Sequence, residues 1–91
     1  MNITFSAQAW EEYLYWQSTD PGMVTKINDL LKVIQRTPFE GIGKPEALKH
    51  GLKGFWSRRI TQEHRLVYRI VGERGMNQVC EVAQCRYHYT R

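Results

Sequence analysis

The stretch DPGMVTKINDLLKVIQRTP, residues 20–38, carries the clearest structural pattern in the chain. Asp20 followed by Pro21 is typical of a helix start, with aspartate as the N-cap and proline at the first helical position. Thr37-Pro38 ends the pattern, because proline disfavours a helical conformation in the residue before it. Between these signals, apolar residues recur at helical spacing and form one stripe: Met23, Val24, Ile27, Leu30, Leu31 and Ile34. We therefore expect an amphipathic helix with one buried face.

Upstream of this helix, the sequence predicts a short strand and a second helix. Asn2–Phe5 is short, β-branched and aromatic, which favours a strand. Ser6 can cap a helix from about Ala7 to Ser18. One face of that helix carries Trp10, Tyr13 and Leu14. We expect the two helices to form an antiparallel hairpin.

Downstream, a loop-rich segment leads into three strand-like runs. Residues 38–54 hold four glycines and two prolines, which predicts a loop. The expected strands are Phe55–Ile60, Arg65–Val71 and Gln78–Arg86, joined by turns at 61–64 and 72–77. This order predicts a single α+β domain over residues 1–91, with both helices on one face of an antiparallel sheet.

Composition limits the classes of protein that the chain can represent. With 91 residues, 42% hydrophobic and 24% charged, the chain is typical of one globular domain. It has no apolar run of about 18 residues and no signal-peptide pattern, so we expect a cytoplasmic protein without a membrane span. Cys80 and Cys85 would point to opposite faces of one strand, so we expect free thiols, with no disulfide, metal site or cofactor.

The distribution of charge indicates an anionic partner. The net charge is +4. Residues 1–40 hold five acidic and three basic residues, whereas residues 41–91 hold four acidic and ten basic residues. A basic half on a small protein favours binding to nucleic acid above other partners.

Strand alternation predicts which side chains share the uncovered face of the sheet. We place on the core side Trp56, Ile60, Leu66, Tyr68, Ile70, Ala83 and Cys85. The opposite, open face then collects Phe55, Ser57, Arg59, Arg65, Val67, Arg69, Gln84, Arg86 and His88, with Glu46 and Lys49 on the adjoining loop. His50 and His64 are expected to be ordinary loop or turn residues. Gly41, Gly43 and Lys44 are expected to form a flexible turn, and Trp10 and Trp16 to be core or partner-interface rings.

The open face combines groups that suit a phosphodiester. Arginine guanidiniums bind phosphate oxygens and stabilise charge that develops on them. A carboxylate and an imidazole can divide the work of general base and general acid. With no metal cluster in the sequence, cleavage would use a neighbouring 2′-hydroxyl, which restricts the substrate to RNA. The alternative is a solvated sheet face whose arginines have no chemical role.

Several stretches resemble the YoeB family of RelE-like toxin–antitoxin ribonucleases. They are RTPFEGIGKPEALKHGLKGFWSRRITQEHRLVY (36–68), CRYHY (85–89), WEEYLYW (10–16) and KINDLLK (26–32). The resemblance implies the same α+β fold and an mRNA endonuclease that works in the ribosomal A site. It also implies a cognate antitoxin, and the family is associated with dimers. The hairpin at 72–82 is longer than the family pattern.

The same resemblance implies roles for individual residues. The glutamate of GKPE, Glu46, would be the general base, and the histidine of RYHY, His88, the general acid. The arginine of EHRLVY, Arg65, would stabilise the transition state. Further RNA contacts would come from Lys49, Arg59, Arg86 and Tyr89, of which Arg86 is included only because of its predicted place on the open face.

Two functions from different classes remain open at this stage. The first is a ribosome-dependent, metal-free ribonuclease that inhibits translation. The second is a binding module whose basic sheet blocks RNA without chemistry. In either case, the resemblance together with the charge asymmetry implies an antitoxin whose acidic, partly disordered segment covers the basic groove.

Overall fold

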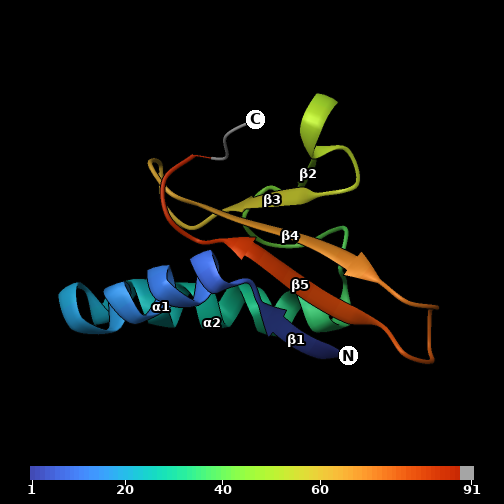
Figure 1. Cartoon of the computed structure of the whole chain (residues 1–91), viewed down its shortest axis with the longest axis horizontal. Coiled ribbons are helices and arrows are strands. Elements are labelled where there is room, and N and C mark those ends of the chain that lie inside the picture. Colours follow the sequence, from blue (N-terminus) through green and yellow to red (C-terminus); the bar gives the residue numbers. More distant parts are fainter. Residues whose placement is uncertain (89–91) are drawn as a thin grey trace.

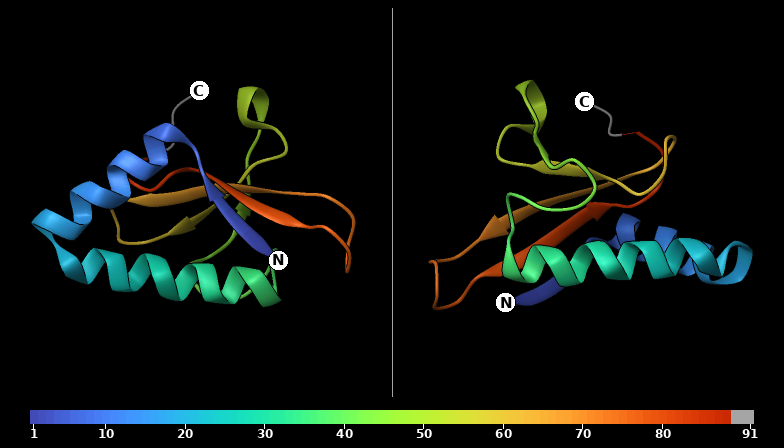
Figure 2. Two further views of the ribbon diagram at one scale, coloured as in Figure 1. Left: turned by 60° about the horizontal axis from the view of Figure 1, so that its bottom comes forward. Right: turned by 180° about the vertical axis from the view of Figure 1, so that it is seen from behind.

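Residues 1–88, which the computed structural model describes, form two helices against one face of a five-stranded sheet (Figure 1). In chain order the elements are β1 (Asn2–Phe5), α1 (Ala7–Thr19), α2 (Pro21–Arg36), β2 (Glu46–Ala47), a 3-10 helix (His50–Leu52), β3 (Trp56–Arg59), β4 (Arg65–Val71) and β5 (Val79–Gln84). The strands lie in the order β1-β5-β4-β3-β2. Two further views show α1 and α2 as a hairpin on the same side of the sheet (Figure 2). The predicted α+β class is therefore confirmed.

The helices begin and end close to the predicted signals. The Ser6 hydroxyl accepts a hydrogen bond from the Ala9 N–H at 3.0 Å and donates one to the carbonyl oxygen of Ala83, also at 3.0 Å. The cap of α1 is thus also tied to the region of β5. Asp20 occupies the N-cap position of α2, although its side chain caps no N–H among the described residues. Neither helix is long and apolar enough to cross a membrane within residues 1–88.

The buried faces of the two helices were predicted with different success. α2 buries five of the six stripe residues, and the sixth, Val24, packs against the core while partly exposed. In α1, however, the buried residues are Ala9 and Trp16. The expectation that the face with Trp10 and Leu14 is buried was wrong, because these residues are 48% and 42% exposed, which leaves Trp10 the predicted alternative of a partner-interface ring. The reason is that α1 turns toward the end of β5, where the Trp16 indole N–H donates to the carbonyl oxygen of Cys85 at 2.9 Å.

The sheet is mixed, because β1 joins it in parallel. β2, β3, β4 and β5 pair antiparallel in turn, as predicted for the last three, whereas β1 runs parallel to β5 with Asn2 opposite Val79. The connection between β1 and the rest of the sheet runs through both helices. This is how a strand at the start of the chain reaches the edge of a sheet built from its second half (Figure 1).

A bulge in β5 changes the alternation of its side chains. Tyr68 of β4 lies opposite Val82, and the next residue back, Val67, lies opposite Gln84, so Ala83 is the extra residue. The prediction of Ala83 on the core side was therefore wrong, and Val82 takes that place with 1% exposure. The same bulge brings Cys80 and Cys85 to the core side. The two thiols are free, as predicted, but they do not lie on opposite faces.

The segment 38–54 contains more structure than predicted. Glu46 and Ala47 form the edge strand β2, which pairs with β3, and residues 50–52 form the 3-10 helix. The preceding loop is held by Arg58, whose side chain is fully buried. Its guanidinium donates to the carbonyl oxygens of Thr37, Glu40 and Ile42 at 2.8–3.0 Å and to the Tyr68 hydroxyl at 3.0 Å. This loop is therefore anchored to β3 and β4.

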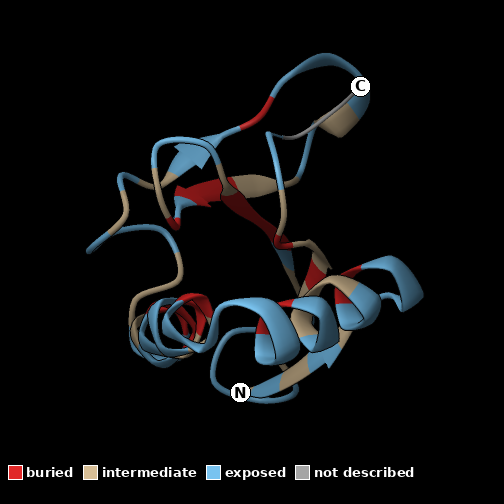
Figure 3. Cartoon of the chain, turned by 90° about the vertical axis from the view of Figure 1, so that its left-hand side faces the viewer, coloured by how far each residue is buried: buried red, intermediate tan, exposed pale blue. Residues whose placement is uncertain are grey.

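The open face of the sheet is less exposed than strand alternation suggests. Leu66 and Tyr68 lie in the core as predicted, and Arg69 faces away from it, where it pairs with Glu81 at 2.6 Å. Ser57 and Val67, which were placed on the open face, are only 2% and 1% exposed. The two residues lie opposite each other on the inner strands β3 and β4. Figure 3 shows buried segments of the sheet above the buried faces of the helices.

Candidate functional site

The predicted catalytic groups meet in one polar cleft at the β2 end of the sheet. The cleft has a volume of about 500 Å³ and is lined by Lys44, Pro45, Glu46, Ser57, Arg59, Arg65 and His88. Four of these had been predicted as site residues, namely Glu46, Arg59, Arg65 and His88. Lys44 and Ser57 had not, because the first was assigned to a flexible turn and the second only to the open face.

Strand register explains why these residues share a face. Glu46 of β2 lies opposite Ser57 of β3, and Arg59 of β3 lies opposite Arg65 of β4. Because side chains alternate along a strand, residues 57 and 59 point the same way, and their partners across the ladder point with them. A carboxylate and two guanidiniums are thereby brought to one surface by backbone pairing alone.

Arg65 is held in a defined orientation by the turn that precedes β4. Its side chain is only 8% exposed, and its Nη1 donates to the carbonyl oxygens of Thr61 and Gln62, each at 2.9 Å, and to that of His64 at 3.2 Å. These bonds use one nitrogen of the five-donor guanidinium fork. A guanidinium remains charged at any physiological pH, so the turn fixes a positive charge at the wall of the cleft.

Glu46 is available to a ligand in this arrangement. It is exposed on the edge strand and forms no ion pair or side-chain hydrogen bond with another residue in the range 1–88.

His88 reaches the cleft on a short segment after β5, residues 85–88, that bends away from the sheet. Two bonds from α1 hold its start: the Cys85 N–H donates to a Glu12 carboxylate oxygen at 2.7 Å, and Trp16 donates to the Cys85 carbonyl at 2.9 Å. At the other end, the Gln84 side-chain amide donates to the carbonyl oxygen of His88 at 3.0 Å. Polar side chains therefore set the course of this segment.

Two of the residues predicted for RNA binding, Lys49 and Arg86, are not brought to the cleft. Lys49 precedes the 3-10 helix and is not among the lining residues. Arg86 lies instead against α1, with its guanidinium 3.7 Å from the ring centre of Tyr15 and 4.6 Å from that of Tyr87. Its predicted position beside His88 was wrong, because alternation ends with β5 at Gln84. Tyr89 lies outside the described residues.

His64 was also assigned too simple a role. It was expected to be an ordinary turn residue, yet its Nδ1 accepts a hydrogen bond from the Tyr87 N–H at 2.7 Å. Sequence patterns gave no signal for this contact, because residues 64 and 87 are brought together only by the pairing of β4 with β5.

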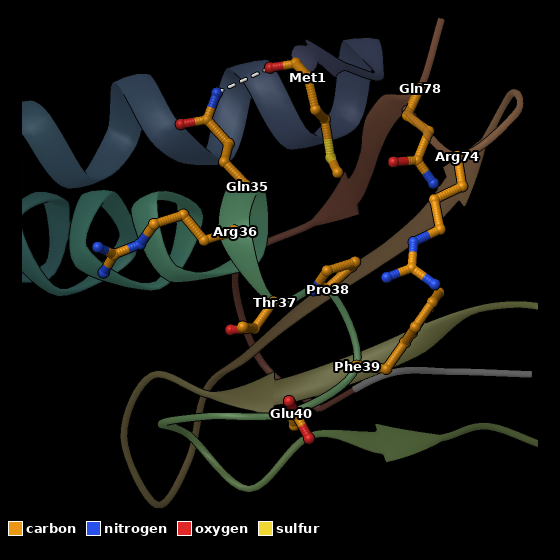
Figure 4. Close-up of a pocket in the computed structure, with 9 residues that line it drawn as sticks. All are labelled: Met1, Gln35, Arg36, Thr37, Pro38, Phe39, Glu40, Arg74 and Gln78. Atoms are coloured by element: carbon orange, nitrogen blue, oxygen red, sulfur yellow. Dashed lines mark hydrogen bonds between the residues drawn. The ribbon is translucent and has the colours of Figure 1, made fainter. Parts of the chain in front are cut away.

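A second cavity, of about 460 Å³, lies at the C-terminal end of α2. Its lining residues are Met1, Gln35, Arg36, Thr37, Pro38, Phe39, Glu40, Arg74 and Gln78 (Figure 4). The Arg36 side chain extends away from Arg74 in this view, so the two guanidiniums do not converge. No histidine is among the described residues that line this cavity, so it lacks the acid–base pair of the polar cleft. Within residues 1–88, no three His, Cys, Asp or Glu side chains gather as a potential metal site.

Solved structures that resemble this chain are those of bacterial toxins. The YoeB/ParE toxin from Agrobacterium tumefaciens superposes with a TM-score of 0.92 at 53% identity, covering 98% of this chain and 100% of that one. The YoeB from Staphylococcus aureus has been solved as a dimer, with a TM-score of 0.86, 53% identity and 98% coverage of each chain. It has also been solved in a heterotetrameric YoeB–YefM toxin–antitoxin complex, with a TM-score of 0.85 and 52% identity over 98% of each chain.

These likenesses define the class as the toxin component of a type II toxin–antitoxin system with the RelE-like fold. Toxin YoeB of Escherichia coli K12 is 56% identical over 89 residues, which cover 98% of this chain and 100% of that protein. The profile of the YoeB-like toxins of bacterial type II toxin–antitoxin systems matches residues 5–89. The chain therefore belongs to the YoeB-like toxin family.

Proposed function

We propose that this toxin is an endoribonuclease that cleaves mRNA in the ribosomal A site and so inhibits translation. The observation that carries the proposal is the cleft in which one carboxylate, one imidazole and two guanidiniums line the same space. These groups match the requirements of phosphodiester cleavage by an adjacent 2′-hydroxyl, a reaction that only RNA can undergo. A substrate on the ribosome places the protein in the cytoplasm.

In the proposed mechanism, Glu46 removes the proton of the 2′-hydroxyl as that oxygen attacks phosphorus. The bond between phosphorus and the 5′-oxygen breaks, and His88 donates a proton to the departing oxygen. The products are a 2′,3′-cyclic phosphate and a 5′-hydroxyl. Arg65 stabilises the charge that grows on the non-bridging oxygens, which is effective because its guanidinium is already oriented by the 61–64 turn. No cofactor takes part in these steps.

The remaining basic residues are proposed to hold the RNA rather than to react. Arg59 and Lys44 line the cleft and can bind the phosphates on either side of the cut. Lys49, Arg86 and Tyr89 remain proposed RNA contacts, the first two from outside the cleft. Arg86 would bind from its position over Tyr15, and Tyr89 would stack on a base.

Two protein partners are also proposed. An antitoxin with an acidic, partly disordered segment would cover the basic cleft, as supported by the YoeB–YefM complex of the S. aureus relative. Loss of Arg59 and Arg65 together should then weaken antitoxin binding, and unchanged binding would exclude this mode. A homodimer is supported by the S. aureus YoeB dimer and by the exposed Trp10, Leu14 and Tyr15 side chains on α1.

The test is primer extension on a defined mRNA in a reconstituted bacterial translation reaction. We expect the native chain to cut within the A-site codon and the variants Glu46→Ala and His88→Ala to lose the cut by at least about 10²-fold, as is typical for removal of a general acid or base. Glu73→Ala and His50→Ala are matched controls outside the cleft and should cut normally. If all variants arrest translation equally and none cuts the mRNA, the protein is a binding module and not a nuclease. The same mRNA without ribosomes tests the ribosome dependence.

A further inference from the structure

The last residue of the turn before β4 and the first residue of β4 both hold the backbone of Tyr87. The Tyr87 N–H donates to Nδ1 of His64 at 2.7 Å, and the Tyr87 carbonyl accepts from the Arg65 N–H at 3.0 Å. Two consecutive residues therefore bind both polar backbone groups of the residue immediately before His88. One of these two residues, Arg65, itself lines the cleft.

His64 is firmly placed by its own surroundings. The Thr61 hydroxyl accepts hydrogen bonds from the N–H groups of Glu63 and His64 at 3.3 and 3.2 Å, which closes the turn. The His64 ring packs edge-on against Trp16, with 4.9 Å between ring centres, and lies 5.5 Å from the ring of Tyr87. Trp16 is buried, and its indole N–H donates to the Cys85 carbonyl. The same tryptophan therefore contacts both the His64 ring and the start of the 85–88 segment.

Tyr87 needs such support because of its backbone conformation. Its φ is +62°, in the left-handed region that side chains with a Cβ atom disfavour. Its side chain is 57% exposed, so core packing of the ring does not enforce this conformation. The hydrogen bonds to its N–H and C=O hold this conformation, together with the Gln84 amide, which donates to the carbonyl oxygens of Arg86 and His88 on either side. The bend at Tyr87 sets the direction in which His88 leaves.

We propose that His64 is a positioning residue: it fixes the bend at Tyr87 and thereby directs the His88 imidazole into the cleft. The inference rests on the proposed nuclease function of that cleft. His64 acts through Tyr87 and does not itself touch the reacting groups.

Two substitutions test the hydrogen-bond acceptor and the aromatic ring of His64 separately. His64→Phe keeps an aromatic ring against Trp16 but removes the acceptor for the Tyr87 N–H. His64→Asn loses the ring but presents a carbonyl oxygen near the position of Nδ1. A purely structural histidine would tolerate phenylalanine better than asparagine, whereas a positioning role through Nδ1 reverses that order.

The experiment measures cleavage of A-site mRNA as a function of ribosome-complex concentration for the native chain and both variants, with His50→Phe as the matched control. We expect His64→Phe to lower kcat by about 10- to 100-fold with little change in KM, because an unheld acid spends little time in reacting geometry. We expect His64→Asn to stay within about threefold of native, since one acceptor replaces another. Amide hydrogen exchange should show that Tyr87 loses its protection in His64→Phe and keeps it in His64→Asn.

Three results would overturn the inference. The first is native cleavage by His64→Phe. The second is an equal loss in both variants that follows their thermal stability. The third is an unchanged exchange rate of the Tyr87 amide in His64→Phe. A failure of the proposed nuclease function can be distinguished from these results, because the native chain and the His50→Phe control would then leave the mRNA uncut.

Discussion

Replacing Arg58 with methionine should remove much of the stability of this domain. The substitution keeps an unbranched side chain on β3 but deletes the donors to four acceptors: the carbonyls of Thr37, Glu40 and Ile42 and the Tyr68 hydroxyl. An acceptor that loses its buried donor costs about 1–3 kcal/mol, and the lower figure applies here because the loop lies near the surface. Four acceptors at about 1 kcal/mol each predict a loss of about 4 kcal/mol in the free energy of unfolding.

That loss is large against the total stability of a small domain, about 5–15 kcal/mol. The assay is urea unfolding followed by the fluorescence of the three tryptophans. Arg59→Met, one residue further along the same strand, is the matched control, because Arg59 is exposed and a change there should stay within about 0.5 kcal/mol. A loss below about 1 kcal/mol for Arg58→Met would refute the view that this side chain anchors the 37–43 loop.

A double-mutant cycle with Tyr68→Phe locates part of the effect. The Tyr68 hydroxyl accepts from Arg58 Nε at 3.0 Å and donates to the Pro38 carbonyl at 2.7 Å, so it links the same loop to β4. Burial raises the pKa of Tyr68, even though the neighbouring Arg58 opposes that shift, so the hydroxyl stays a donor at neutral pH. We expect a coupling energy of about 1 kcal/mol between the two substitutions, and additive losses would mean that the bond contributes little.

Two further predictions concern the core and the helix cap. Burial raises the pKa of both Cys80 and Cys85 to about 12, so neither thiol should react with iodoacetamide at pH 8 in the folded protein, whereas both should react in urea. As pH rises above 9 the unfolded chain loses these protons and the folded chain keeps them, so the free energy of unfolding should fall between pH 9 and pH 12; a flat profile would contradict the burial of the thiols. Ser6→Ala should lower the free energy of unfolding by about 1–2 kcal/mol in urea titrations, because it removes the cap of α1 and the bond to Ala83. Ser18→Ala, near the other end of α1, is its control and should change little.

Local sequence signals were enough for the parts of the fold that depend on local physics. Proline and serine at helix starts and the apolar stripe of α2 act within a few residues, and the structure places both helices accordingly. Strand alternation correctly set Arg59 and Arg65 on one face, because β3 and β4 are regular up to that point. The meeting of Glu46, Arg59, Arg65 and His88 was therefore within reach of sequence reasoning combined with the family resemblance.

The parts that were missed depend on contacts between distant segments. The bulge at Ala83 shifts the alternation of side chains along β5, and the local sequence contains no signal that predicts this extra residue. Arg58 looks like one more surface cation, yet its donors meet carbonyls that only the folded loop brings to it. The bond between His64 and Tyr87 likewise exists only once β4 and β5 have paired.

The pairing of β1 with β5 also has a consequence for folding during synthesis of the protein. Because Asn2 lies opposite Val79, the first strand has no partner until about 77 further residues have been synthesised, roughly ten seconds later at ordinary elongation rates. α1 waits as well, since its cap and its buried tryptophan bond to Ala83 and Cys85. His88 emerges later still. A nascent chain thus has no finished cleft until residues 79–88 have left the ribosome, because the strand, the helix and the histidine that complete the fold and the cleft all depend on that segment.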